Sequence, residues 1–155
     1  GTPLGIKLRN MALDGEAKSK IAEMFLFMAD RAEHIEEVIK KNKNDTIISD
    51  RSMISGIAYA SALSIDELIN LNLIATNNTL PTHVILLELT PHELKFRLSQ
   101  KENDSIELRG IDYLINIQNR MKETIKRLNI NHIIIDASLK IEEIEKKIED
   151  FINGE

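Results

Sequence analysis

Asp50 and Arg51 are adjacent charged residues whose place in the sequence suggests chemistry. They follow residues 46–49, a short apolar segment with β-branched side chains, which predicts a buried strand of a parallel sheet. In open α/β sheets, ligands bind beyond the carboxyl ends of the strands. A carboxylate and a guanidinium at such a place could bind a metal ion and a phosphate group. An ion pair that only ends the strand would explain the same two residues.

Phe27 and Arg31 form a second candidate set, on a long helix predicted over residues 17–41. Because they are four residues apart, both project from nearly the same face of that helix, beside its apolar stripe. An aromatic ring with an arginine one turn later can stack on a planar base and hydrogen-bond to it. The alternative is a wide apolar face that includes Phe27, with Arg31 paired to Glu23 or Glu36.

A third set follows the Asp50 corner. Ser55 and Gly56 could bring a hydroxyl group and a backbone N–H close to a ligand, and Tyr59 could line the same cavity. The start of an ordinary helix with a buried tyrosine is the other reading. A charged stretch at 101–109 is typical of a solvated surface loop, or of a lid that closes over phosphates.

Alternating helix and strand patterns organise these residues. Strands separated by helices predict βαβ units, and therefore an α/β fold with a parallel sheet and helices on both of its faces. Three strands make a thin sheet for so many helices, so at least one further strand is expected on the N-terminal side. Strands are predicted at 46–49, 84–89 and 132–135, and helices at 3–13, 17–41, 64–77, from 90 onward, 111–128 and 141–152.

Composition narrows the class of protein. The 155 residues suffice for one domain. The absence of cysteine excludes disulfides and cysteine-ligated zinc. A net charge of −5 argues against a nucleic-acid partner. No apolar run approaches the ~20 residues that span a bilayer, and no leader opens the chain, so a cytoplasmic protein without a membrane partner is expected. Neither a P-loop nor a G-x-G-x-x-G motif occurs.

In order and spacing, six stretches make the chain resemble a bacterial-type thymidylate kinase, a nucleoside-monophosphate kinase of the P-loop class. The resemblance extends over essentially the whole chain, and it favours the ligand-binding readings of Phe27, Arg31 and Arg51. It also implies a single domain over residues 1–155. The stretches are 1–4 with 8–9, 26–34, 47–52, 55–59, 104–107 and 136–138.

The resemblance implies how the acceptor nucleotide, dTMP, would be recognised. Phe27 would stack on the thymine ring, and Arg31 would hydrogen-bond to the base and help to distinguish thymine from cytosine. Tyr59 would pack against the deoxyribose and disfavour a 2′-hydroxyl group. Ser55 would add a hydroxyl group near the base.

The resemblance also implies the phosphate chemistry, with ATP as donor and Mg²⁺ as cofactor. Arg9 and Arg51 would hold the dTMP phosphate, which suits arginine because its planar fork grips phosphate oxygens bidentately. Asp50 would lie near the magnesium–phosphate region, so Arg51 and Asp50 are the catalytic candidates. The loop at 136–138 would lie near the adenine. Residues 99–110 would be the lid, with its charge supplied by Arg97, Lys101 or Arg109.

The family's first strand and P-loop would precede Gly1, so the chain is expected to lack roughly 30 or more residues. Without that loop the ATP phosphates have no cradle, and the chain as given is expected to be inactive. The complete protein would convert dTMP to dTDP, as a homodimer joined through helices beside the acceptor site. Two alternatives are another nucleoside or nucleotide kinase, and a non-catalytic module for nucleotide binding or dimerisation.

Overall fold

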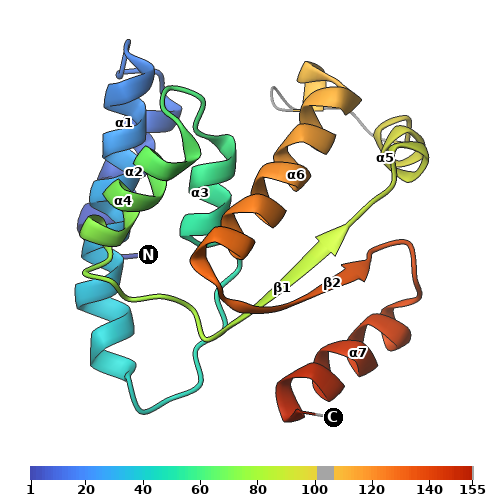
Figure 1. Cartoon of the computed structure of the whole chain (residues 1–155). Coiled ribbons are helices and arrows are strands. Elements are labelled where there is room, and N and C mark those ends of the chain that lie inside the picture. The colour runs from blue at the N-terminus through green and yellow to red at the C-terminus, as the bar shows by residue number, and fades with distance from the viewer. Residues whose placement is uncertain (101–106, 155) are drawn as a thin grey trace. The chain divides into compact units, whose positions relative to one another are not determined.

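A computed structural model describes residues 1–100 and 107–154 of the chain. The fold divides into two compact units, Gly1–Leu80 and Pro81–Glu155. The first consists of helices and the second contains the sheet (Figure 1). One domain over residues 1–155, with a lid at 99–110, stays a prediction.

Two helices of the first unit begin where the sequence predicts them, whereas the long helix begins at Lys20 and not at about residue 17. Thr2 caps the first helix, its hydroxyl oxygen accepting from the backbone N–H of Gly5, and Pro3 occupies the first turn. Ser64 and Glu67 form a reciprocal capping box. The elements are α1 (Pro3–Leu13), α2 (Lys20–His34), the π-helical turn η1 (Ile35–Ile39), the 3-10 turn η2 (Lys40–Asn42), α3 (Met53–Tyr59) and α4 (Ile65–Ala75).

Helix α4 packs against both α2 and α3, and this packing forms the core of the first unit. Leu68 of α4 and Ile57 of α3 are completely buried, and Met24 and Met28 mark the inner face of α2. Because α3 has only seven residues, it is too short to be stable alone and depends on this packing. The positions of side chains on α2, α3 and α4 are therefore fixed together.

The strand expected at 46–49 is not formed, which corrects the sequence-based prediction. Among the described residues, only two strands pair, and neither includes this segment. Ile48 is 91% exposed and Ile47 is 38% exposed. A strand exists through ladder hydrogen bonds to a neighbour, so β-branched residues alone do not create one.

The second unit contains a parallel pair of strands, in register from His83 opposite Asn131 to Glu88 opposite Asp136. Glu88 accepts a 2.5 Å bond from Lys122, and the ring of His83 meets the ring of Phe151 edge-on. The elements are β1 (His83–Glu88), α5 (Pro91–Leu98), the 3-10 turn η3 (Glu107–Arg109), α6 (Ile111–Leu128), β2 (Asn131–Asp136) and α7 (Ile141–Asn153).

Residues 83 and 88 point to opposite faces of β1, because side chains alternate along a strand. Helices α6 and α7 therefore cover opposite faces of the strand pair (Figure 1). This arrangement confirms the predicted α/β class with a parallel sheet. Within the described ranges, none of the helices combines the length and the apolar character needed to cross a bilayer.

Candidate functional site

Three helices of the first unit meet at the side chain of Arg31. Arg31 lies in the last turn of α2, and its Nη1 donates a 2.5 Å hydrogen bond to Oδ1 of Asn72 on α4. On α3, a Cβ added to Gly56 would lie 2.3 Å from Nη2 of Arg31. The guanidinium therefore lies against the backbone of α3, and only glycine leaves room for it there.

The charge of Arg31 is held in a largely desolvated place. Burial lowers the pKa of the guanidinium, and the negative charge of Asp30 acts in the opposite direction. Arginine nevertheless stays protonated in proteins. A donor with a full positive charge in a low-dielectric setting attracts a hydrogen-bond acceptor more strongly than it would in water.

Phe27 precedes Arg31 by one turn of α2 and is half buried. The two side chains therefore project from nearly the same face of a regular helix, as predicted. Directly after this face, the helix widens into the π-helical turn η1, where the N–H of Lys40 bonds to the carbonyl of Ile35. Such turns are rare in proteins, and those that occur often lie at functional sites. The sequence pattern predicted one continuous helix and did not reveal this turn.

The Arg51 corner is strained. Arg51 has φ of +66°, in the left-handed region that residues other than glycine rarely adopt. Its carbonyl accepts a 2.8 Å bond from the Ser49 hydroxyl, and the Ser52 hydroxyl caps α3. Backbone strain of this kind costs about 1–3 kcal/mol and clusters at ligand sites. The corner therefore directs an arginine side chain outward at an energetic cost.

Tyr59, the last residue of α3, contacts the Arg51 corner. The guanidinium carbon of Arg51 lies 5.6 Å from the centre of the Tyr59 ring, a cation–π arrangement. Ser55 and Tyr59 are one turn apart on α3, and Gly56 lies between them in sequence. The short helix α3 therefore contacts Arg31 through Gly56 and Arg51 through Tyr59.

Arg9 and Asp50 are exposed, and within the described residues neither makes a hydrogen bond or an ion pair with another predicted site residue. Among the described residues, no cluster of three or more histidine or acidic side chains could hold a metal ion. Mg²⁺ usually binds one or two carboxylates together with substrate phosphates and water. The single carboxylate of Asp50 fits that mode and does not form a metal site by itself.

The three predicted lid residues have different outcomes. Nη2 of Arg97 donates a 2.6 Å hydrogen bond to the carbonyl of Ala137, in the loop after β2. Nη1 of Arg109 donates a 3.1 Å bond to the Tyr113 hydroxyl, and its guanidinium carbon lies 5.0 Å from the centre of that ring. Lys101 lies outside the described residues. The lid role of all three stays a prediction.

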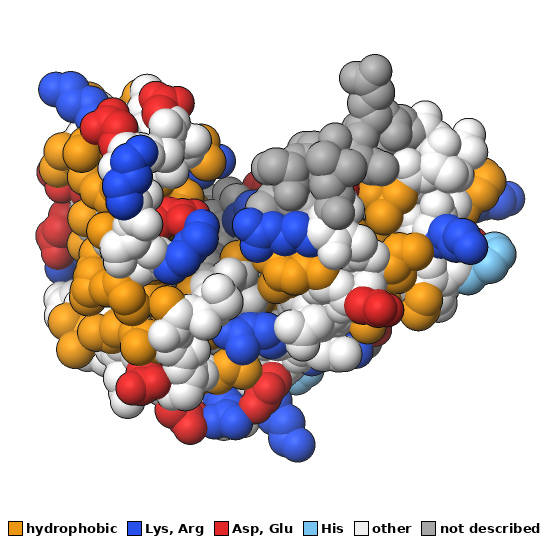
Figure 2. Space-filling view, turned by 90° about the horizontal axis from the view of Figure 1, so that it is seen from above, with side chains coloured by type: hydrophobic (Ala, Val, Ile, Leu, Met, Phe, Trp, Pro, Cys, Tyr) orange, Lys and Arg blue, Asp and Glu red, His pale blue; other side chains and the backbone are white. Residues whose placement is uncertain are grey.

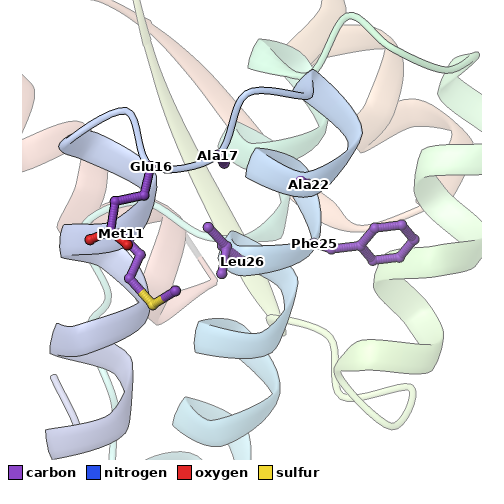
Figure 3. A pocket seen from close by; sticks show the side chains of 6 residues that line it. All are labelled: Met11, Glu16, Ala17, Ala22, Phe25 and Leu26. Atoms are coloured by element: carbon purple, nitrogen blue, oxygen red, sulfur yellow. The ribbon is translucent and has the colours of Figure 1, made fainter.

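A shallow pocket of about 440 Å³ lies elsewhere in the first unit, between the end of α1 and the start of α2. In Figure 3, Leu26 points from α2 toward Met11 of α1. None of the predicted site residues lines this pocket, and its surface is mostly apolar. The lining residues are Met11, Glu16, Ala17, Ala22, Phe25 and Leu26.

An arginine-centred site on three helices and a parallel α/β unit are consistent with a nucleotide kinase of the nucleoside-monophosphate class. The family model described as thymidylate kinase matches residues 1–148. A thymidylate kinase of Aliarcobacter butzleri is 81% identical over 153 residues, covering 99% of this chain and 81% of the relative. A thymidylate kinase of Wolinella succinogenes is 51% identical, covering 96% and 78%. The corresponding protein of Nautilia profundicola is 48% identical, covering 98% and 78%.

The chain belongs to the thymidylate kinase family, whose members are kinases, and hence transferases, of nucleotide biosynthesis. The expectations that a first strand and a P-loop precede Gly1, and that the chain without them is inactive, stay predictions. Asn72 and Gly56 are the residues around Arg31 that the sequence did not identify as its partners. A polar residue within the apolar helix α4 was the available signal for Asn72.

Proposed function

We propose that the protein transfers the γ-phosphoryl group of ATP to dTMP, giving dTDP, and that the first unit carries the dTMP site. The observation that carries this proposal is the partly buried guanidinium of Arg31, held between α3 and α4, one helical turn after Phe27. A ring that stacks on the base and a fixed donor at its edge are what recognition of a planar base requires.

Hydrogen-bond chemistry explains how Arg31 would distinguish thymine from cytosine. Thymine presents its O4 oxygen as an acceptor where cytosine presents an amino donor. Arg31 has only donors, so it can hydrogen-bond to O4 of thymine but not to the amino group that cytosine carries at the same position. Tyr59, on the neighbouring α3, would contact the deoxyribose, and Ser55 would reach the base from the same helix.

Phosphoryl transfer depends mainly on positioning and charge neutralisation. Arg51 would hold the acceptor phosphate, with Arg9 as a second cation, so that two anions can approach each other. Mg²⁺, when bound with ATP, would neutralise the donor phosphates, and Asp50 could supply one ligand for it. A cytoplasmic location stays a prediction.

Selective stabilisation by dTMP is the first expected result. A ligand that binds only the folded state raises the melting temperature, and at equal concentrations the ligand with the higher affinity raises it more. We expect dTMP to raise the melting temperature of the chain clearly more than equal concentrations of dCMP and UMP, measured by differential scanning calorimetry. Equal stabilisation by dTMP and dCMP would instead indicate another nucleotide kinase. No stabilisation by any of the three would contradict a nucleotide site.

A homodimer is proposed through the helices of the first unit, where apolar side chains reach the surface (Figure 2). Phe25 of α2 is 50% exposed and Ile74 of α4 is 77% exposed. We expect sedimentation equilibrium to give twice the chain mass, and Phe25→Glu to lower it to one chain. The matched control is Phe96→Glu in the second unit, at a phenylalanine that is 58% exposed, which should leave the dimer intact. A monomeric unmodified protein would contradict the proposal.

A further inference from the structure

Asn72 is a polar residue in the interior of the first unit, and its side chain is 1% exposed. Both the oxygen and the nitrogen of its side-chain amide form hydrogen bonds. Oδ1 accepts the 2.5 Å bond from Nη1 of Arg31, and Nδ2 donates a 2.7 Å bond to the carbonyl of Leu68 one turn earlier. The bond to Leu68 fixes the rotation of the amide, so that its oxygen faces α2.

We propose that Asn72 is a positioning residue that sets base selectivity by orienting the guanidinium of Arg31. The inference rests on the proposed function, in which Arg31 reads the base. Asn72 itself does not contact the nucleotide in this account. It acts through the direction in which the remaining donors of Arg31 point.

The geometry of guanidinium gives this role its physical basis. The group is planar and its N–H bonds point in fixed directions, so one strong bond at Nη1 restricts where the donors on Nη2 and Nε can point. The backbone at Gly56 limits the other side of the plane, because Nη2 lies against it. A donor held in this way can meet the thymine O4 oxygen without first losing rotational freedom.

An oxygen atom that accepts from Nη1 is what Arg31 takes from its partner. Within the described residues, no ion pair involves Arg31, so its anchor is the amide oxygen of Asn72. An acceptor at this place sets the direction of the guanidinium. If Asn72 had only a structural role, its substitution would lower stability but would leave the preference for dTMP over dCMP unchanged.

Two substitutions separate the two hydrogen bonds of Asn72. Asn72→Asp keeps an oxygen that can accept from Arg31 but removes the donor to Leu68. Asn72→Ser does the opposite, because its hydroxyl can bond back to the Leu68 carbonyl but is too short to reach Arg31. Thr76→Val is the matched control, since Thr76 is 2% exposed and lies one turn later on the same segment.

The experiment measures dissociation constants of dTMP and dCMP by isothermal titration calorimetry. We expect Asn72→Ser to weaken dTMP binding roughly tenfold and to lower the preference for dTMP over dCMP by a similar factor. Asn72→Asp and Thr76→Val should keep both quantities within about threefold. In an Arg31→Met background, Asn72→Ser should change dTMP binding no further, because residues that act through one contact are not additive.

Three results would overturn the inference alone: an unchanged preference in Asn72→Ser, an equal loss in Asn72→Asp, or an undiminished effect of Asn72→Ser in the Arg31→Met background. An unmodified protein that binds dTMP and dCMP equally would overturn the proposed function as well. Should Asn72→Ser fail to fold while Asn72→Asp folds normally, the Arg31 bond would be a requirement of the fold, and the positioning role would be rejected.

Discussion

Replacement of Arg51 by alanine is expected to weaken dTMP binding about 100-fold, since the acceptor phosphate loses charge-assisted hydrogen bonds from a bidentate donor. Arg51→Lys keeps the charge and loses the fork, so a weakening of about tenfold is expected. Calorimetric titration of each variant with dTMP measures both effects. The fold should persist, because alanine, lysine and arginine all meet the same strain at φ of +66°.

Thymidine is the control ligand for the Arg51 variants, because it keeps the base and sugar of dTMP and lacks the phosphate. Its affinity should be the same for the unmodified protein and for Arg51→Ala. If Arg51→Ala lost thymidine affinity as strongly as dTMP affinity, Arg51 would be a support for Tyr59 and α3, which its ring contact at 5.6 Å also permits. The phosphate role would then be wrong.

Leu68→Ala is expected to lower the free energy of unfolding by about 3 kcal/mol, the range for a large core side chain being about 2–5 kcal/mol. Leu68 is completely buried on α4, which packs on α2 and α3. Urea denaturation measures the loss. Ile141→Ala on α7 is the control, because Ile141 is 71% exposed and its truncation should cost less than about 0.5 kcal/mol.

A loss below about 1 kcal/mol for Leu68→Ala would mean that the site collapses without a cavity and that α4 is loosely packed. The packing matters for function, since α4 carries Asn72 and the Leu68 carbonyl accepts its Nδ2 bond. We therefore expect surviving Leu68→Ala protein to bind dTMP more weakly, even though position 68 is remote from the ligand in the proposed site.

Local signals in the sequence predicted the helices well. Thr2 with Pro3, and Ser64 with Glu67, specify helix starts through hydrogen bonds within four residues, and both starts are observed. The parallel strands at 83–88 and 131–136 followed from their apolar runs between helices. Phe27 and Arg31 share a face because helical spacing alone requires it. Such features depend on residues only a few positions apart, so the sequence alone is enough to predict them.

Only the tertiary structure decided which strands pair and which distant side chains meet. Residues 46–49 have the composition of a strand, yet pairing depends on a distant neighbour that periodicity does not specify. Asn72 bonds to a side chain 41 residues away, and the fit of Arg31 against Gly56 requires α2 and α3 to meet. The sequence by itself determined most of the helices, though not the π-helical turn η1, and the residue types suited to a thymine nucleotide. The packing of α4 on α2 and α3 determined how Arg31 is held, because only packing sets the distance between side chains on different helices.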